Sequence, residues 1–148
     1  MIYLASDHRG LELKEKVSQW LKEWGYQLED LGPFEYNKDD DYPDFAEAVG
    51  KMVASNEDSR GILICGSGVG IDVAANKIDG VRAGTISEPE QAKAAVHDED
   101  LNVISLASDF LEEDKAKEIV KAFVEAKYES TDRYERRLDK IDKIEDNN

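Results

Sequence analysis

The chain has 148 residues, 41% of them hydrophobic, which fits one domain with a single core over residues 1–148. Its formal net charge of −15 argues against nucleic-acid partners, because a polyanion would be repelled by most of the surface. No apolar run approaches the roughly 18 residues of a membrane span, and the start of the chain lacks the pattern of a signal peptide. A lone cysteine cannot form an internal disulfide, so we expect a cytoplasmic protein.

The first half of the chain predicts strands that alternate with helices. Residues 2–6 (IYLAS) predict a short buried strand, and the helix that follows is expected to stop at Gly25. Residues 26–32 (YQLEDLG) predict a second strand that ends in a turn at the next proline. Residues 37–44 (NKDDDYPD) form an acidic loop, which we expect to be solvated rather than a metal site. The next helix is marked by Phe45, Val49, Met52 and Val53.

The second half continues this alternation. Residues 61–65 (GILIC) are a continuous aliphatic run, as expected for a strand covered on both faces. Residues 87–100 predict a helix with Ser87 as its N-cap and Pro89 in the first turn. The remaining segments are a helix at 69–77, strands at 81–86 and 102–108, a helix with a stripe from Ala116 to Val124, and an amphipathic helix at about 130–145.

Strands alternating with helices form βαβ units, whose right-handed crossovers place helices on both faces of a parallel sheet. The sequence therefore predicts an α/β protein with a five-stranded parallel sheet and a C-terminal helix. That last helix is apolar along one stripe and highly charged elsewhere. It could cover the surface of its own domain or reach across to a second subunit.

The segment GILICGSGVG places three glycines, Gly66, Gly68 and Gly70, directly after a predicted strand. In an open parallel sheet, ligands bind beyond the carboxyl ends of the strands. Glycines let backbone N–H groups approach a ligand, and the following helix N-terminus favours an anion. The spacing fits neither a dinucleotide-binding fingerprint nor a P-loop, and a tight turn without a ligand remains an equal alternative.

Cys65 strengthens the case for a site, because a cysteine at a helix N-terminus has a stabilised thiolate. Such a thiolate could act as a general base or as a nucleophile, and Ser67 could offer a hydroxyl to the same ligand. The alternative is an inert buried cysteine. Asp7 and His8 follow the first strand on the same edge of the sheet, where they could bind a ligand or serve as a helix cap and a surface residue.

Arg133 and Arg137 are four residues apart and therefore share one helical face. Two guanidinium groups on one face suit a phosphate. On composition alone, ion pairs with Glu129 or Glu135 on the surface are the favoured alternative.

Together these segments resemble the ribose-5-phosphate isomerase B family, which also includes the galactose-6-phosphate isomerase subunits. The resemblance runs from Ile2 to about Ile144 and rests on ASDHRGLELK, DYPDFAEAV, GILICGSGVGIDVAANK, VRAGTISEPE, NVISLAS and RYERRLDKI, in that order. It implies a Rossmann-like three-layer α/β/α sandwich that forms a homodimer or tetramer. It also implies an isomerisation of ribose 5-phosphate to ribulose 5-phosphate through a cis-enediolate, without a metal or other cofactor.

The resemblance also assigns roles to residues. Cys65 is the base, and Ser67 supports an anion hole made by the backbone N–H groups of the glycine loop. Asp7 and His8 contact the sugar phosphate, and Tyr42 of the DYP motif lines the pocket. The other residues implied are the loop members Gly66, Gly68, Val69 and Gly70, and the phosphate-binding Arg133 and Arg137, which act partly across the dimer interface.

The chain departs from the family pattern at several positions. Asp98 occupies the column of the ring-opening histidine, His97 lies one place early, and Glu99 occupies the column of a substrate-binding asparagine. Asp109 replaces an arginine after the fifth strand, and the approach to the final arginines is one residue longer. These changes predict a more negative pocket. They leave open an isomerase for another phosphosugar, or a paralogue that binds a sugar phosphate without turnover.

Overall fold

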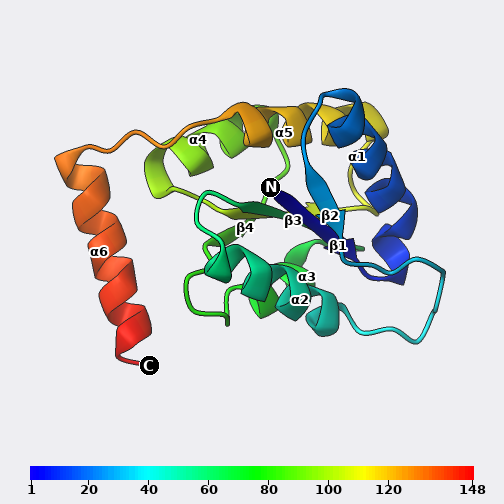
Figure 1. The fold of residues 1–148 in the computed structure, drawn as a ribbon, viewed down its shortest axis with the longest axis horizontal. Coiled ribbons are helices and arrows are strands. Elements are labelled where there is room, and N and C mark those ends of the chain that lie inside the picture. The colour runs from blue at the N-terminus through cyan, green and yellow to red at the C-terminus, as the bar shows by residue number, and fades with distance from the viewer.

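The computed structural model describes residues 1–148 and contains one five-stranded sheet between two layers of helices (Figure 1). All paired strands are parallel, in the order β2-β1-β3-β5-β4. This confirms the predicted Rossmann-like α/β/α sandwich. The strands are β1 (Ile2–Ser6), β2 (Leu28–Asp30), β3 (Arg60–Cys65), β4 (Ala83–Thr85) and β5 (Val103–Ala107).

The helices divide between the two faces of the sheet, as Figure 1 shows. One apolar core lies between the sheet and α1, α4 and α5, and a second lies between the sheet and α2 and α3. The helices are the short 3₁₀ turn η1 (His8–Gly10), α1 (Leu11–Glu23), α2 (Tyr42–Ser55), α3 (Val69–Ala75), α4 (Pro89–Glu99), α5 (Glu113–Glu125) and α6 (Asp132–Asp146).

The strand order creates a reversal between β1 and β3. From β1 the chain moves to β2 on one side, and it then crosses back over the other face to β3. At such a reversal the two neighbouring loops leave on opposite faces of the sheet, so a crevice opens at the carboxyl ends of the strands. Here the reversal lies between the end of β1 and the end of β3.

Two local expectations differ from the structure. The strands β2 and β4 have only 3 residues each, shorter than the patterns at 26–32 and 81–86 predict. They are the two edge strands, where pairing on one side only supports less regular structure. The N-cap of α4 is Glu88 rather than Ser87, because Pro89 occupies the first helical position, and the backbone N–H of Ser87 instead donates to Gln91 Oε1.

Helix α6 extends away from the three layers (Figure 1). Tyr134 is its one buried residue, and apolar Ile144 on the same helix is 67% exposed. Isolated exposed aliphatic residues are ordinary, but an amphipathic helix with its stripe left uncovered suggests a contact with another surface. None of the helices combines the length and apolar character that a membrane span requires.

A buried ion pair joins α1 to the end of β2. The side chain of Lys14 is 1% exposed, and its Nζ lies 2.7 Å from both carboxylate oxygens of Asp30. Asp30 Oδ1 also accepts the backbone N–H of Gly32 at 2.9 Å. A buried ammonium is tolerated only when it is paired, so this contact fixes α1 against the edge of the sheet.

We predict that Lys14→Ala lowers the free energy of unfolding by about 3 kcal/mol, the low end for breaking a buried pair, because Asp30 is partly exposed. Lys16→Ala is the matched control, since Lys16 forms only exposed pairs with Glu12 and Glu113 and should change stability by about 0.5 kcal/mol or less. Urea unfolding at one fixed protein concentration measures both. Equal losses in the two variants would contradict a special role for Lys14.

Candidate active site

The carboxyl ends of three neighbouring strands are joined around Cys65. The backbone N–H of Asp7 donates to Ile64 O at 3.1 Å, which continues the ladder from β1 beyond its last residue. On the other side, the backbone N–H of Ser108 donates to Cys65 O at 2.9 Å, and the Ser108 hydroxyl donates to the same carbonyl at 3.1 Å. The end of β3 is therefore held from both sides.

Strand register brings the side chains of Cys65 and Asp7 together. Ser6 pairs with Ile64, so the next residues along, Asp7 and Cys65, lie side by side. Neighbouring residues of parallel strands project to the same face. Cys65 belongs to the core on the side of α2 and α3, and its thiol is almost fully buried. The register thus places Cys65 and Asp7 next to each other on the same face of the sheet, at the carboxyl ends of β3 and β1.

Gly66 and Gly70 lie close to neighbouring side chains, and Gly68 has a backbone conformation that favours glycine. A Cβ on Gly66 would lie 2.5 Å from the guanidinium carbon of Arg9, and one on Gly70 would lie 2.8 Å from the ring of Tyr42. Gly68 has φ of 76°, a left-handed conformation that other residues rarely adopt. The Arg9 and Tyr42 side chains therefore lie against the loop, and the role of Tyr42 in lining a ligand pocket stays a prediction.

The same loop offers several backbone N–H groups to a ligand. The N–H groups of Gly66, Ser67, Gly68 and Gly70 donate to no acceptor within the chain, while that of Val69 donates to Ser67 Oγ at 3.2 Å. Helix α3 has only 7 residues, so these N–H donors matter more than the helix dipole. Successive free N–H groups are the arrangement expected of an anion hole.

Asp7 caps η1 and also lies next to Cys65 at the end of β3. Its Oδ1 accepts the backbone N–H groups of Arg9 (3.0 Å) and Gly10 (3.2 Å), as expected for the residue that begins η1. Burial raises the pKa of the Asp7 carboxyl, and the hydrogen bond from Gly10 only partly offsets this. A carboxyl group with a raised pKa beside a thiol can exchange protons with a bound ligand.

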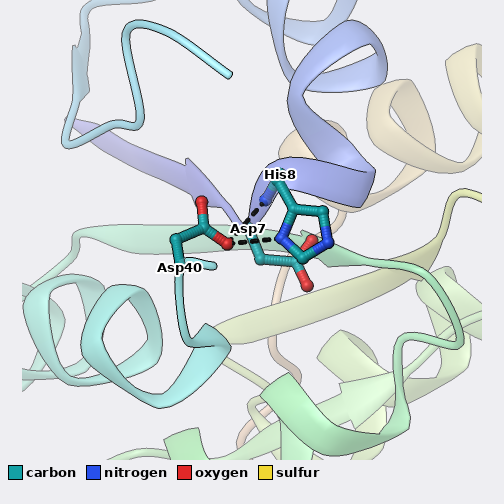
Figure 2. Close-up of side chains that lie close together, drawn as sticks. All are labelled: Asp7, His8 and Asp40. Atoms are coloured by element: carbon teal, nitrogen blue, oxygen red, sulfur yellow. Dashed lines mark hydrogen bonds and ion pairs between the residues drawn. The ribbon is translucent and has the colours of Figure 1, made fainter. Parts of the chain in front are cut away.

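His8 is oriented by a residue that the sequence did not suggest. Asp40 Oδ1 accepts the backbone N–H of His8 at 3.0 Å and lies 2.6 Å from His8 Nδ1 (Figure 2). Because a carboxylate only accepts, Nδ1 carries the hydrogen and Nε2 is left for a ligand. The side chain of Asp40 is only 9% exposed, so the expectation of a fully solvated acidic loop is wrong at this residue.

Asp7, His8 and Asp40 also place possible metal-binding atoms within 4.8 Å of one another. Two ligands of one tetrahedral metal ion lie roughly 3.3 Å apart, given bond lengths of about 2 Å. The separation of 2.6 Å between His8 and Asp40 is that of a hydrogen bond. His8 and Asp40 are therefore arranged as a hydrogen-bonded pair, and the nearby Asp7 carboxyl accepts from backbone N–H groups of η1 instead.

A polar network between β4, β5 and α3 holds the glycine loop at Gly68. The sequence analysis did not predict it. The hydroxyl of Ser105 donates to Gly68 O at 2.8 Å, and that of Thr85 donates to Asp72 Oδ2 at 2.7 Å. The two hydroxyl oxygens lie 2.9 Å apart. The one available signal was a serine inside the otherwise aliphatic strand segment NVISLAS.

The remaining predicted residues form a second group. His97 Nδ1 lies 2.6 Å from Asp98 Oδ1, and His97 Nε2 lies 2.7 Å from Glu129 Oε2. The hydrogen bond to Asp98 raises the pKa of His97, and the same bond lowers the pKa of Asp98. Tyr134 packs edge-on against the His97 ring and accepts a hydrogen bond from Arg133 at 3.2 Å.

This second group lies at the opposite edge of the sheet from Cys65. Helix α4 begins after the carboxyl end of β4 and runs 11 residues, roughly 16 Å, back toward the start of β5. His97, Asp98 and Glu99 are its last residues, and Glu99 lines a groove with Ile141 of α6. Helix α6 begins at this same edge, with Arg133 and Arg137 exposed. The structure does not bring these five residues to the Cys65 loop of their own chain.

We predict that Asp7→Asn raises stability relative to the unsubstituted protein at neutral pH and that this difference shrinks in acid. A folded-state pKa above the ordinary 3.8 means that the protein loses stability as the pH rises from about 4 through the folded-state pKa. Asparagine can still accept the N–H groups of Arg9 and Gly10, but it does not titrate. Urea unfolding across pH measures the difference, and a difference that grows on acidification would contradict the assignment.

Comparison with known proteins places this geometry in a family. Residues 2–141 match the Ribose/Galactose Isomerase family. The chain is 45% identical over 146 residues to the probable ribose-5-phosphate isomerase B of Mycoplasma genitalium (97% of this chain, 95% of that protein). It is 40% identical over 144 residues to ribose-5-phosphate isomerase B of Escherichia coli (97% and 95%).

Solved structures agree with the sequence comparisons. The structure of ribose-5-phosphate isomerase B from Mycoplasma genitalium with bound ribulose-5-phosphate matches with a TM-score of 0.95 at 42% identity, covering 99% of this chain and 97% of that one. The type B ribose 5-phosphate isomerase of Trypanosoma cruzi matches with a TM-score of 0.94 at 31% identity, covering 99% of each chain. The chain therefore belongs to the ribose/galactose isomerase family.

Proposed function

We propose that this protein is an aldose–ketose isomerase that interconverts ribose 5-phosphate and ribulose 5-phosphate. The observation that carries the proposal is the thiol of Cys65 at the end of β3, beside the Asp7 carboxyl and a loop of free backbone N–H groups. A base, a proton carrier and an anion hole are the three parts that an enediolate mechanism needs. Family membership and the similar protein with bound ribulose-5-phosphate support the choice of substrate.

In the proposed reaction, the Cys65 thiolate removes the proton from C2 of the open-chain aldose. The electron pair of that C–H bond forms a C1–C2 double bond, and the carbonyl oxygen becomes negatively charged. The free N–H groups of the loop stabilise this charge in the enediolate. Return of the proton to C1 gives the ketose, and the Asp7 carboxyl, whose pKa is raised, moves the proton between the two sugar oxygens.

We further propose that the site is completed by a second copy of the chain. A substrate phosphate needs cations, and Arg133 and Arg137 lie at the edge of the sheet opposite Cys65. A dimer that sets this edge of one copy against the glycine loop of the other would bring them together. The exposed Val69 and Val73 on α3 and Ile144 on α6 are apolar surface that such an interface would cover. Dimer and tetramer both fit this arrangement.

The second candidate function is isomerisation of a different phosphosugar, or binding without turnover. The feature that favours it is the group around His97, where both ring nitrogens are paired with carboxylates, Asp98 and Glu129. A histidine engaged in this way is a poorer ring opener, so the true substrate could open differently. In either function we expect a cytoplasmic protein that acts as one domain, since a reducing compartment keeps the Cys65 thiol free.

We predict that Cys65→Ala reduces isomerisation of ribose 5-phosphate by roughly a hundred-fold or more, the contribution of a positioned general base. Removing the thiol leaves only a small cavity, so binding of the phosphosugar and folding should be largely retained. A coupled assay measures turnover, and calorimetry with ribose 5-phosphate measures binding. Near-native turnover in this variant would show that Cys65 is a structural residue.

We predict that two inactive variants restore each other when their chains are mixed. If Cys65 of one copy works with the arginines of another, a dimer of Cys65→Ala with Arg133→Ala/Arg137→Ala contains one intact site. Random reassortment would give about a quarter of the native activity, since half of the dimers are mixed and each has one of two sites intact. Unfolding and refolding the mixture forms the mixed dimers. No recovery of activity would place the whole site within one chain.

A further inference from the structure

The edge of the sheet that carries the glycine loop has its own guanidinium group. Arg9 follows His8 in η1, and its side chain lies directly against the loop. A Cβ added to Gly66 would be 2.5 Å from Arg9 Cζ and 2.6 Å from Nε, so the absence of a side chain at position 66 makes room for this cation. The sequence pattern drew attention to neither contact.

Asp109 holds the Arg9 side chain in this place. Arg9 Nη2 donates a hydrogen bond to Asp109 Oδ2. The backbone N–H of Asp109 donates to Gly66 O at 3.0 Å. The hydroxyl of Ser108 donates to Arg9 O at 3.0 Å. Asp109 is therefore hydrogen-bonded through its backbone to the residue after β3, and the Arg9 side chain lies against that same residue.

The ion pair between Arg9 and Asp109 is too exposed to contribute much to the free energy of unfolding. The Arg9 and Asp109 side chains are 56% and 36% exposed, and such pairs contribute about 1 kcal/mol or less. A guanidinium has five N–H donors, and the contact with Asp109 uses one edge of it. The remaining donors can bind a second anion. Elsewhere at this edge, the ammonium of Lys14 is already paired with Asp30.

We propose that Arg9 binds the phosphate of the sugar phosphate in the glycine-loop site, with Asp109 as its positioning residue. The inference rests on the proposed function of that site and names a cation that the sequence analysis did not include. It also gives Asp109 a role that the expectation of a more negative pocket did not include. The carboxylate is neutralised by Arg9, and the guanidinium is the member of the pair whose side chain lies on Gly66.

Kinetics of Arg9 variants test the proposal. We expect Arg9→Ala to raise KM for ribose 5-phosphate by about 10- to 100-fold, the range of a charge-assisted contact with phosphate, and to change kcat by less than about three-fold. Arg9→Lys, which keeps the charge but loses the planar fork, should lie between. The control is Lys51→Ala, which removes an equal charge from an exposed pair on α2 and should leave KM unchanged. A KM for Arg9→Ala equal to that of the control overturns the proposal.

Exchanging the charges of Arg9 and Asp109 distinguishes binding of the substrate phosphate from a purely structural ion pair. Arg9→Asp should raise KM more than Arg9→Ala, because two carboxylates then face the substrate phosphate. In Arg9→Asp/Asp109→Arg, the backbone of position 109 still bonds to Gly66 O, so the new guanidinium remains beside the loop. We expect KM to fall by about ten-fold or more relative to Arg9→Asp. If the exchange restores the unfolding midpoint but not KM, the pair is only structural and the proposal fails.

Binding measured without turnover distinguishes this proposal from the proposed isomerase activity. The probes are ribose 5-phosphate and unphosphorylated ribose, and the readout is the shift of the thermal unfolding midpoint. If the unsubstituted protein is protected by ribose 5-phosphate but does not isomerise it, and Arg9→Ala is not protected, the isomerase function fails and the Arg9 site stands. Equal protection of both proteins, or equal losses with the two sugars, overturns the Arg9 site. No protection of either protein overturns both.

Discussion

The parallel direction of all five strands is the constraint on which the rest of this structure depends. It gathers the carboxyl ends of β1, β3 and β5 at one edge, where a ladder bond from Asp7 and two bonds from Ser108 hold the end of β3. The reversal of the chain between β1 and β3 lies at the same place, which is where open parallel sheets bind their ligands. A thiol, a carboxyl group and free N–H groups meet there because each follows a strand end, although they come from separate segments.

Neighbouring side chains hold the glycine loop closely at this edge of the sheet. The loop after Cys65 has Arg9 on one side and Tyr42 on another, and Ser105 holds the Gly68 carbonyl from within the sheet. Contacts this close disfavour a side chain at positions 66 and 70 unless the Arg9 or Tyr42 side chain moves aside. A loop with close neighbours keeps its backbone in place, and under the proposed function its free N–H groups would stabilise a developing anion without reorganisation.

The same parallel arrangement separates the predicted site residues of one chain into two groups. Each helix that connects parallel strands must run back to the amino edge, so α4 delivers His97 and Asp98 to the side away from Cys65. Helix α6 starts at that edge as well and stays mostly exposed. A chain with a net charge of −15 cannot attract a phosphate by its overall field. Under the proposed function local cations would do so, and the Arg9 side chain lies against the loop within the same chain.

The sequence by itself determined the alternation of strands and helices, the parallel sheet and the position of Cys65 at a strand end. These features follow from local hydrophobic patterns and from the handedness of βαβ crossovers, which need no knowledge of distant residues. Only the tertiary structure decided the partners of the polar side chains. Asp40 meets His8 across 32 positions of sequence, and Asp109 meets Arg9 across 100. The paths of loops set such contacts, and no local pattern in the sequence encodes where a loop will cross a strand end.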